Sequence, residues 1–212
     1  MAKQKQTARI WREKLIIPTY EMGEEERLPI FHKLRINQGT KGDIYPYKTR
    51  DQLLLERNDN HEYDAIRLEN DYIRVTVLPE LGGRIYEGYD KVNDYNFVYK
   101  NNVIKPALIG LNGAWISGGI EFNWPQHHRP TTFLPLESTI EEEPDGSLTA
   151  WVGETEAMNG LKSLLGVSIH PDRAVITAKA KLYNPTPQTQ TFHWWANLAV
   201  HVNDNYRLLF PP

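Results

Sequence analysis

The stretch Ala174-Val-Ile-Thr-Ala-Lys-Ala-Lys-Leu-Tyr183 indicates the fold class, because apolar and polar side chains alternate along it. One set of positions holds Ile176, Ala178, Ala180 and Leu182, and the other holds Val175, Thr177, Lys179 and Lys181. Successive side chains of a β-strand point to opposite faces, so this pattern predicts a strand with one face in solvent. Residues 164–170 precede it across Asp172-Arg173, which predicts an antiparallel hairpin.

Two further antiparallel groups are predicted upstream of this hairpin. Residues 137–143 and 147–152 flank Pro144-Asp-Gly146, where proline presets φ and glycine accepts a positive φ. Residues 65–69, 72–78 and 84–89 form the other group, and Leu81-Gly-Gly-Arg-Ile85 is predicted to be a turn within it. Only residues 51–57 have a helical composition, so we expect one short helix there. The chain is therefore predicted to be all-β, an antiparallel β-sandwich.

Two regions are expected along the chain. Residues 1–60 are interrupted by glycine and proline, and we expect an irregular N-terminal extension that wraps or extends the sheets. Residues 61–212 are expected to form the N-terminal part of the sandwich, incomplete at the C-terminus because the sequence stops directly after an apparent strand. The expected partners are therefore the C-terminal remainder of a longer chain and, through unpaired strand edges, a second copy in a homodimer.

Composition excludes several functional classes. The 212 residues carry 24 Lys+Arg and 27 Asp+Glu, a net charge of −3, which excludes a nucleic-acid binder that relies on a basic surface. The absence of cysteine excludes disulfides, thiolate metal sites and cysteine nucleophiles. No apolar stretch approaches the roughly 20 residues of a membrane-spanning helix, and no signal-like segment follows the charged start. We expect a cytoplasmic protein with no nucleic-acid or membrane partner.

The most unusual segment is Trp115-Ile-Ser-Gly-Gly-Ile-Glu-Phe-Asn-Trp-Pro-Gln-His-His-Arg-Pro130. Its paired glycines allow close backbone approach, and its polar groups beside an aromatic ring describe a pocket for a polar ligand. Candidate substrate-binding residues here are Glu121, Asn123, Trp124 and Arg129, and candidate catalytic residues are His127 and His128. Adjacent side chains of an extended backbone diverge, so at most one of the two histidines enters such a pocket. The alternative is a turn after a core strand, with Trp124 as packing.

A second candidate segment is Phe192-His-Trp-Trp-Ala-Asn-Leu-Ala-Val-His201. His193 beside two indoles is a candidate catalytic residue, because an imidazole suits proton transfer near neutral pH. Trp194, Trp195 and Asn197 are candidate substrate-binding residues. The alternative is an aromatic core strand with a hydrogen-bonded histidine. His193 and His201 lie about 26 Å apart on one strand at 3.3 Å per residue, and the sequence has no His-x-His or HExxH motif, so we expect no metal and no cofactor.

Three segments in the same order resemble the galactose mutarotase-like (aldose 1-epimerase-like) superfamily. Residues 68–85 are similar to the opening hairpin of its domains, and Gly118-Gly-Ile-Glu-Phe-Asn-Trp-Pro125 with the following histidines is similar to a GGIPxxWP segment. Asn184-Pro-Thr186 followed by His193-Trp-Trp-Ala-Asn-Leu198 resembles an N-x-T…H-x-Y-F-N-L segment. The whole chain looks closest to bacterial mutarotase-like domains that often precede tetratricopeptide repeats.

The resemblance implies a sandwich that binds a sugar or oligosaccharide, with His193 as catalytic acid. It places the general base beyond residue 212, so we expect the 212-residue chain itself to be inactive. Two alternatives stay open. One is a non-catalytic glycan-binding module of a larger repeat-containing scaffold protein. The other is a domain related to glycoside hydrolases, with Glu121 as one of two carboxylates.

Overall fold

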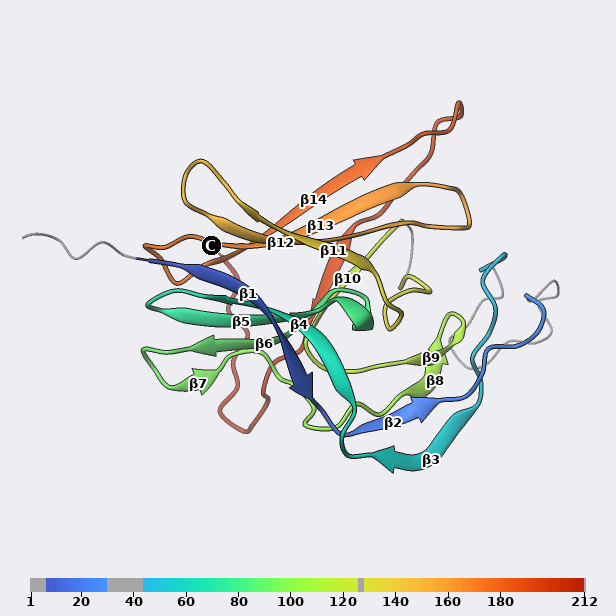
Figure 1. Cartoon of the computed structure of the whole chain (residues 1–212), viewed down its shortest axis with the longest axis horizontal. Coiled ribbons are helices and arrows are strands. Elements are labelled where there is room, and N and C mark those ends of the chain that lie inside the picture. The colour runs from blue at the N-terminus through green and yellow to red at the C-terminus, as the bar shows by residue number, and fades with distance from the viewer. Residues whose placement is uncertain (1–6, 30–43, 126–127, 212) are drawn as a thin grey trace, which may run out of the picture.

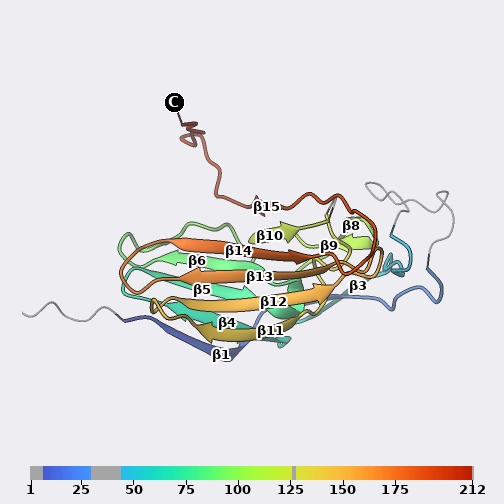
Figure 2. The same cartoon turned by 90° about the horizontal axis from the view of Figure 1, so that it is seen from above.

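The computed structural model describes residues 7–29, 44–125 and 128–211, and they form two stacked antiparallel sheets (Figure 1 and Figure 2). The larger sheet has the order β1-β4-β5-β6-β10-β15, with β7 paired to β6. Its strands are β1 (Arg9–Ile16), β4 (Glu62–Glu69), β5 (Ile73–Leu78), β6 (Arg84–Asp90), β7 (Tyr95–Asn96), β10 (Ile120–Asn123) and β15 (Trp195–Leu198). The smaller sheet has the order of its strands in sequence, β11 (Glu137–Glu142), β12 (Leu148–Thr155), β13 (Lys162–Ile169) and β14 (Ile176–Tyr183).

The main core lies between the two sheets. Ile66 and Val75 of the larger sheet and Leu165 and Val167 of the smaller sheet are fully buried in it, together with Phe122 of β10. These residues occupy alternate positions of their strands, so the period-two pattern places apolar side chains inward. The predicted all-β sandwich and its three antiparallel groups are confirmed.

A second core covers part of the outer face of the larger sheet. The strands β2 (Thr19–Met22) and β3 (Leu53–Asn58) pair with each other, and so do β8 (Ala107–Gly110) and β9 (Gly113–Trp115). These four strands lie together at one end of the molecule in Figure 1. Tyr63 and Ala65 of β4, which alternate with the inward residues, pack there against Ala114 and Ile116. This arrangement carries β9 to the outer side of β10.

One prediction for the N-terminal region is wrong, and one segment is more regular than expected. The helix expected at residues 51–57 is absent, because Leu53–Asn58 is strand β3, paired with β2 from Thr19↔Asn58 to Met22↔Leu53. Helix propensities differ by less than about 1 kcal/mol per residue, so strand pairing and the contact of Leu53 with the second core override them. Arg9–Ile16, expected to be irregular, is the edge strand β1 and extends the larger sheet.

The predicted turn at Leu81-Gly-Gly-Arg-Ile85 is confirmed. A single 3-10 turn, η1 (Pro79–Leu81), is followed by Gly82 and Gly83 at φ of 69° and 70°. A Cβ on Gly82 would lie 2.2 Å from the carbonyl oxygen of Thr132. Glycine is therefore required there both for the left-handed backbone and for the approach of the 131–134 segment.

Candidate functional site

The pairing of β10 with β15 determines which predicted residues share a face. Glu121 lies opposite Asn197, and Asn123 lies opposite Trp195. Cross-strand partners share a face, so these four side chains lie on the outer side of the larger sheet, whereas Phe122 belongs to the main core. We use the name β10–β15 site for Trp115, Glu121, His128, His193, Trp195 and Asn197.

Glu121 is the buried centre of this site, only 3% exposed. The indole Nε1–H of Trp115 donates to its Oε1 over 3.3 Å, and the amide Nδ2–H of Asn197 donates to its Oε2 over 3.2 Å. The Nδ1 of His128 lies 3.3 Å from the same Oε1. Three different side chains therefore converge on one carboxylate.

The carboxylate of Glu121 is held in its ionised form. Burial by itself would raise the pKa of Glu121, but the hydrogen bond from His128 and the positive charge of Arg84 outweigh it, and the pKa lies below its ordinary value of 4.5. Arg84 is itself buried, and its guanidinium donates to the carbonyl oxygens of Ile116 and Gly118 over 2.9 Å. Burial lowers the pKa of Arg84 to about 10, although the charge of Glu121 acts in the opposite direction.

Two of the predicted histidines, His128 and His193, lie near the same indole. The ring of His128 meets Trp195 edge to face at 4.7 Å, and the ring of His193 lies 6.4 Å from the same indole. The backbone N–H of His193 donates to the carbonyl of Pro125, which ties the start of β15 to the end of β10. His193 is exposed, and His128, Trp195 and Asn197 are partly exposed. The structure thus brings the two candidate segments together.

Three other predicted residues are not part of this site. Trp124 is 2% exposed in the main core, and Trp194 stacks on Phe122 with ring centroids 6.1 Å apart. The Oδ1 of Asn123 accepts the backbone N–H of Arg129 over 3.1 Å, and Asn123 is fully buried. His127 lies outside the described residues.

Arg129 is also enclosed. Its Nε donates to the carbonyl of Phe122 over 2.8 Å, and its Nη1 donates to Glu154 over 3.0 Å. Its guanidinium also lies 4.1 Å from the ring centroid of Trp124. These contacts join the two sheets, so we do not include Arg129 in the β10–β15 site.

Sequence reasoning did not name Trp115 or Arg84 as residues of the site. Trp115 is six residues from Glu121, but β9 reaches it only because the second core folds back over β10. Arg84 is 37 positions from Glu121 and acts through charge rather than through a motif. No local signal in the sequence separates either residue from ordinary strand residues.

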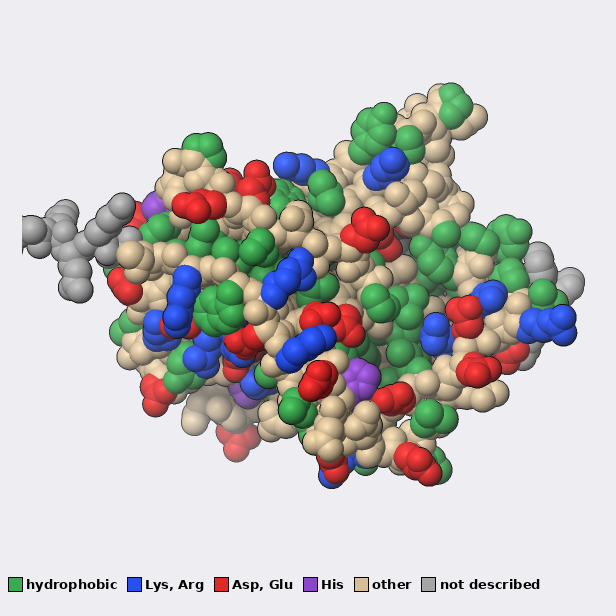
Figure 3. Space-filling model, in the orientation of Figure 1, with side chains coloured by type: hydrophobic (Ala, Val, Ile, Leu, Met, Phe, Trp, Pro, Cys, Tyr) green, Lys and Arg blue, Asp and Glu red, His purple; other side chains and the backbone are tan. Residues whose placement is uncertain are grey.

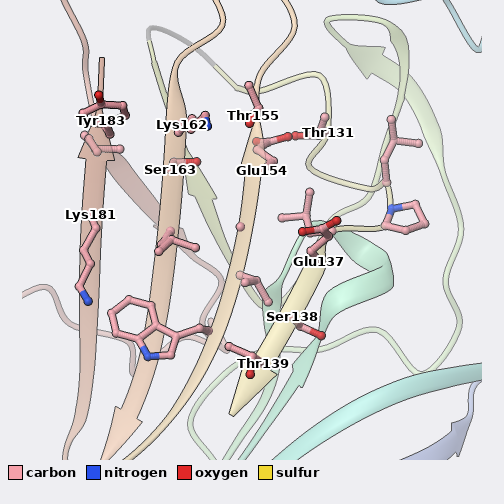
Figure 4. Close-up of a pocket in the computed structure, with 18 residues that line it drawn as sticks. Thr131, Glu137, Ser138, Thr139, Glu154, Thr155, Lys162, Ser163, Lys181 and Tyr183 are labelled. Atoms are coloured by element: carbon pink, nitrogen blue, oxygen red, sulfur yellow. The ribbon is translucent and has the colours of Figure 1, made fainter. Parts of the chain in front are cut away.

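Apart from the β10–β15 site, a hollow of about 850 Å³ lies against the smaller sheet (Figure 4). Residues of all four of its strands line this hollow, including Glu137, Trp151, Lys162, Leu164 and Tyr183. It contains none of the residues predicted from the sequence. The Nε1–H of Trp151 donates to Glu141 over 2.6 Å, and the ammonium of Lys181 lies 4.4 Å from the centroid of the indole. Trp151 is only 6% exposed, whereas Trp195 is partly exposed, so Trp151 offers less aromatic surface to a ligand.

The described residues contain neither a metal centre nor a membrane-spanning helix. Within the described ranges, no three metal-ligating side chains of His, Cys, Asp or Glu converge. No helix in this part of the chain combines the length and the apolar character needed to cross a bilayer. Acidic and basic side chains are intermixed on the face of the molecule shown in Figure 3.

The fold and the site define an antiparallel β-sandwich domain with a polar and aromatic cluster on the outer face of its larger sheet. Residues 40–212 match the family model described as "Domain of unknown function (DUF5107)", and the chain belongs to this family.

The fold is similar to the crystal structure of a TPR-domain containing protein from Parabacteroides distasonis ATCC 8503, with a TM-score of 0.81 and 24% identity. The match covers 93% of this chain and 33% of that protein, so the chain spans about a third of its length. At this identity the likeness establishes the fold alone.

Proposed function

We propose that the domain binds a neutral saccharide at the β10–β15 site. The observation that carries the proposal is the partly exposed indole of Trp195, which lies near the imidazoles of His128 and His193 and on the same face as the amide of Asn197. A sugar ring has an apolar C–H face and a rim of hydroxyl groups. An indole face packs against the first, and imidazole and amide groups exchange hydrogen bonds with the second.

The finer form of the proposal is a mutarotase-like domain that works by acid–base chemistry. It is supported by the β-sandwich, by the resemblance of residues 184–198 to the mutarotase segment, and by the exposure of His193. In this form, protonated His193 delivers a proton to the ring oxygen while a carboxylate takes the proton of the C1 hydroxyl. General acid–base catalysis of this kind accelerates a reaction by a factor of about 10² to 10⁴.

The binding-only alternative has an observation in its favour. The similar crystal structure belongs to a protein described as TPR-domain containing, and this chain matches a third of that protein. A glycan-binding module attached to helical repeats would use the aromatic surface for affinity and the histidines for hydrogen bonds. Both forms share the same ligand surface, so one binding experiment tests them together.

The test is a titration of the ¹⁵N-labelled 212-residue chain with glucose, galactose and a mixed oligosaccharide, followed by NMR. We expect shifts at the indole of Trp195 and the amide of Asn197, and at least a tenfold loss of affinity in Trp195→Ala. Tyr183→Ala is the matched control, because Tyr183 is an exposed aromatic residue at the hollow of the smaller sheet. Chemical-shift changes confined to Leu164 and Tyr183 would show that the ligand binds in that hollow and would contradict the proposal. The absence of any shift change would also contradict it.

Catalysis is tested separately by polarimetry of glucose and galactose mutarotation. We expect the sugars to bind without any acceleration of mutarotation by this chain. Acceleration that His193→Ala abolishes would show that the chain is catalytic and would contradict the binding-only form.

A further inference from the structure

The contacts of Glu121 indicate a role that differs from ligand binding. Its Oε1 is shared by Trp115 and His128, its Oε2 accepts from Asn197, and only 3% of the residue is exposed. A ligand hydroxyl at the surface therefore has little access to this carboxylate. His128, by contrast, has 32% of its side chain exposed. A ligand at the surface can therefore reach the side chain of His128 but hardly that of Glu121.

The charge of Glu121 determines which nitrogen of His128 carries the proton. Both oxygens of Glu121 accept from N–H groups, Oε1 from Trp115 and Oε2 from Asn197, and an ionised carboxylate only accepts hydrogen bonds. The Nδ1 of His128, 3.3 Å from Oε1, must therefore donate. In a neutral imidazole one nitrogen is protonated and the other is an acceptor.

We propose that Glu121 is a positioning residue that fixes the proton of the neutral His128 ring on Nδ1 and so makes Nε2 the ring nitrogen able to accept a proton. The edge-to-face contact with Trp195 at 4.7 Å and that with Trp115 at 6.5 Å hold the plane of the ring. The same logic applies to carboxylate–histidine pairs that orient metal ligands and catalytic bases.

A consequence for the ligand rests on the proposed function. A saccharide hydroxyl that meets His128 would donate its proton to Nε2. His128 would then serve as a hydrogen-bond acceptor for the bound saccharide, while the exposed His193 near the same indole would serve as the donor. The two imidazoles near Trp195 would thus have opposite roles in hydrogen bonding.

The test reads the tautomer directly in the ligand-free chain. Long-range ¹H–¹⁵N spectra of the imidazole rings are recorded at a pH at which the rings are neutral. The signals of His128 are assigned as those that disappear in His128→Gln. We expect a protonated Nδ1 and an unprotonated Nε2 for His128. In Glu121→Gln the carboxamide both donates and accepts, so we expect the Nδ1–H form to fall from the dominant to the minor species.

His170 supplies the matched control, because its Nδ1 lies 2.6 Å from the exposed carboxylate of Asp172. Asp172→Asn should leave the His128 spectrum unchanged, and Glu121→Gln should leave that of His170 unchanged. A wild-type His128 with the proton on Nε2 overturns the assignment even if the Glu121 variant fails to fold. Because no sugar is present, the result is independent of whether a saccharide binds.

Discussion

At the level of single residues, Gly119 shows why the paired glycines precede the site. Its φ is +75°, and a Cβ would lie 2.5 Å from the carbonyl oxygen of Ile85. Its N–H donates to Tyr99 over 2.7 Å, and its carbonyl accepts from Ala199 over 3.0 Å. The close approach indicated by the sequence is thus between β6 and the start of β10. This backbone junction lies two residues before Glu121 of the β10–β15 site.

Gly119→Ala should be strongly destabilising. Left-handed strain and the clash with the Ile85 carbonyl together cost about 3 kcal/mol or more. Gly160→Ala is the control, because Gly160 has φ +73° and an added Cβ would have no atom within 4 Å, so only the strain of about 1–2 kcal/mol remains. Urea unfolding followed by tryptophan fluorescence gives both values. Equal losses in the two variants would show that the contact with Ile85 relaxes.

At the level of the strands, a row of charges joins β1, β4, β5 and β6 on the outer face of the larger sheet. Arg67 donates to Glu13 over 2.5 Å and to Glu87 over 3.0 Å, and Lys100 donates to the other oxygen of Glu87 over 2.8 Å. Burial would raise the pKa of Glu87, but Lys100, Arg74 and Arg67 outweigh it and hold the pKa below its ordinary value of 4.5. Adjacent strands are therefore joined by side chains as well as by backbone.

The stability of the protein should fall as the pH is lowered from about 5 toward 3. The folded pKa of Glu87 is below the unfolded value, so the unfolded state binds the proton more readily. The contribution of Glu87 is complete above the unfolded pKa and is lost as the pH falls through the folded pKa. In Glu87→Gln the free energy of unfolding should be lower at pH 7 and change less with pH in this range. An unchanged slope in urea titrations at several pH values would contradict this.

At the scale of the molecule, the two sheets are open along one side. β14 and β15 are the edge strands there, and Ala178, Ala180, Ala196 and Leu198 are exposed although their positions alternate toward the space between the sheets. Leu198, for example, is 55% exposed. Exposed apolar positions on an unpaired strand edge favour association with another strand.

Self-association through this side is therefore expected. Light scattering should show a mass that rises with protein concentration, and Ala180→Glu should return the chain to monomers by placing a charge on the inward face of β14. Thr177→Glu is the control, because Thr177 lies on the opposite face of the same strand. A monomer at all concentrations, or equal effects of the two substitutions, would show that this side does not mediate association.

Local sequence patterns were sufficient to predict the class of fold and the strands of three antiparallel groups, β4 to β6, β11 with β12, and β13 with β14. The alternation in residues 174–183 and the turn residues at 144–146 act locally, and local chemistry is enough to predict a hairpin. These patterns did not predict β3, where pairing with β2 overrides the helical preference of 51–57. Of the residues that they indicated for a site, the structure brings together Glu121, His128, His193, Trp195 and Asn197.

Which of those residues meet depends on the tertiary structure. The register of β10 against β15 sets Glu121 opposite Asn197, and the fold of β9 over β10 brings Trp115 to the same carboxylate. The pairing also separates Glu121 from Trp124, although the two are three residues apart, because adjacent strand positions face opposite sides of the sheet. Contacts between distant segments depend on register and packing, which no local pattern encodes.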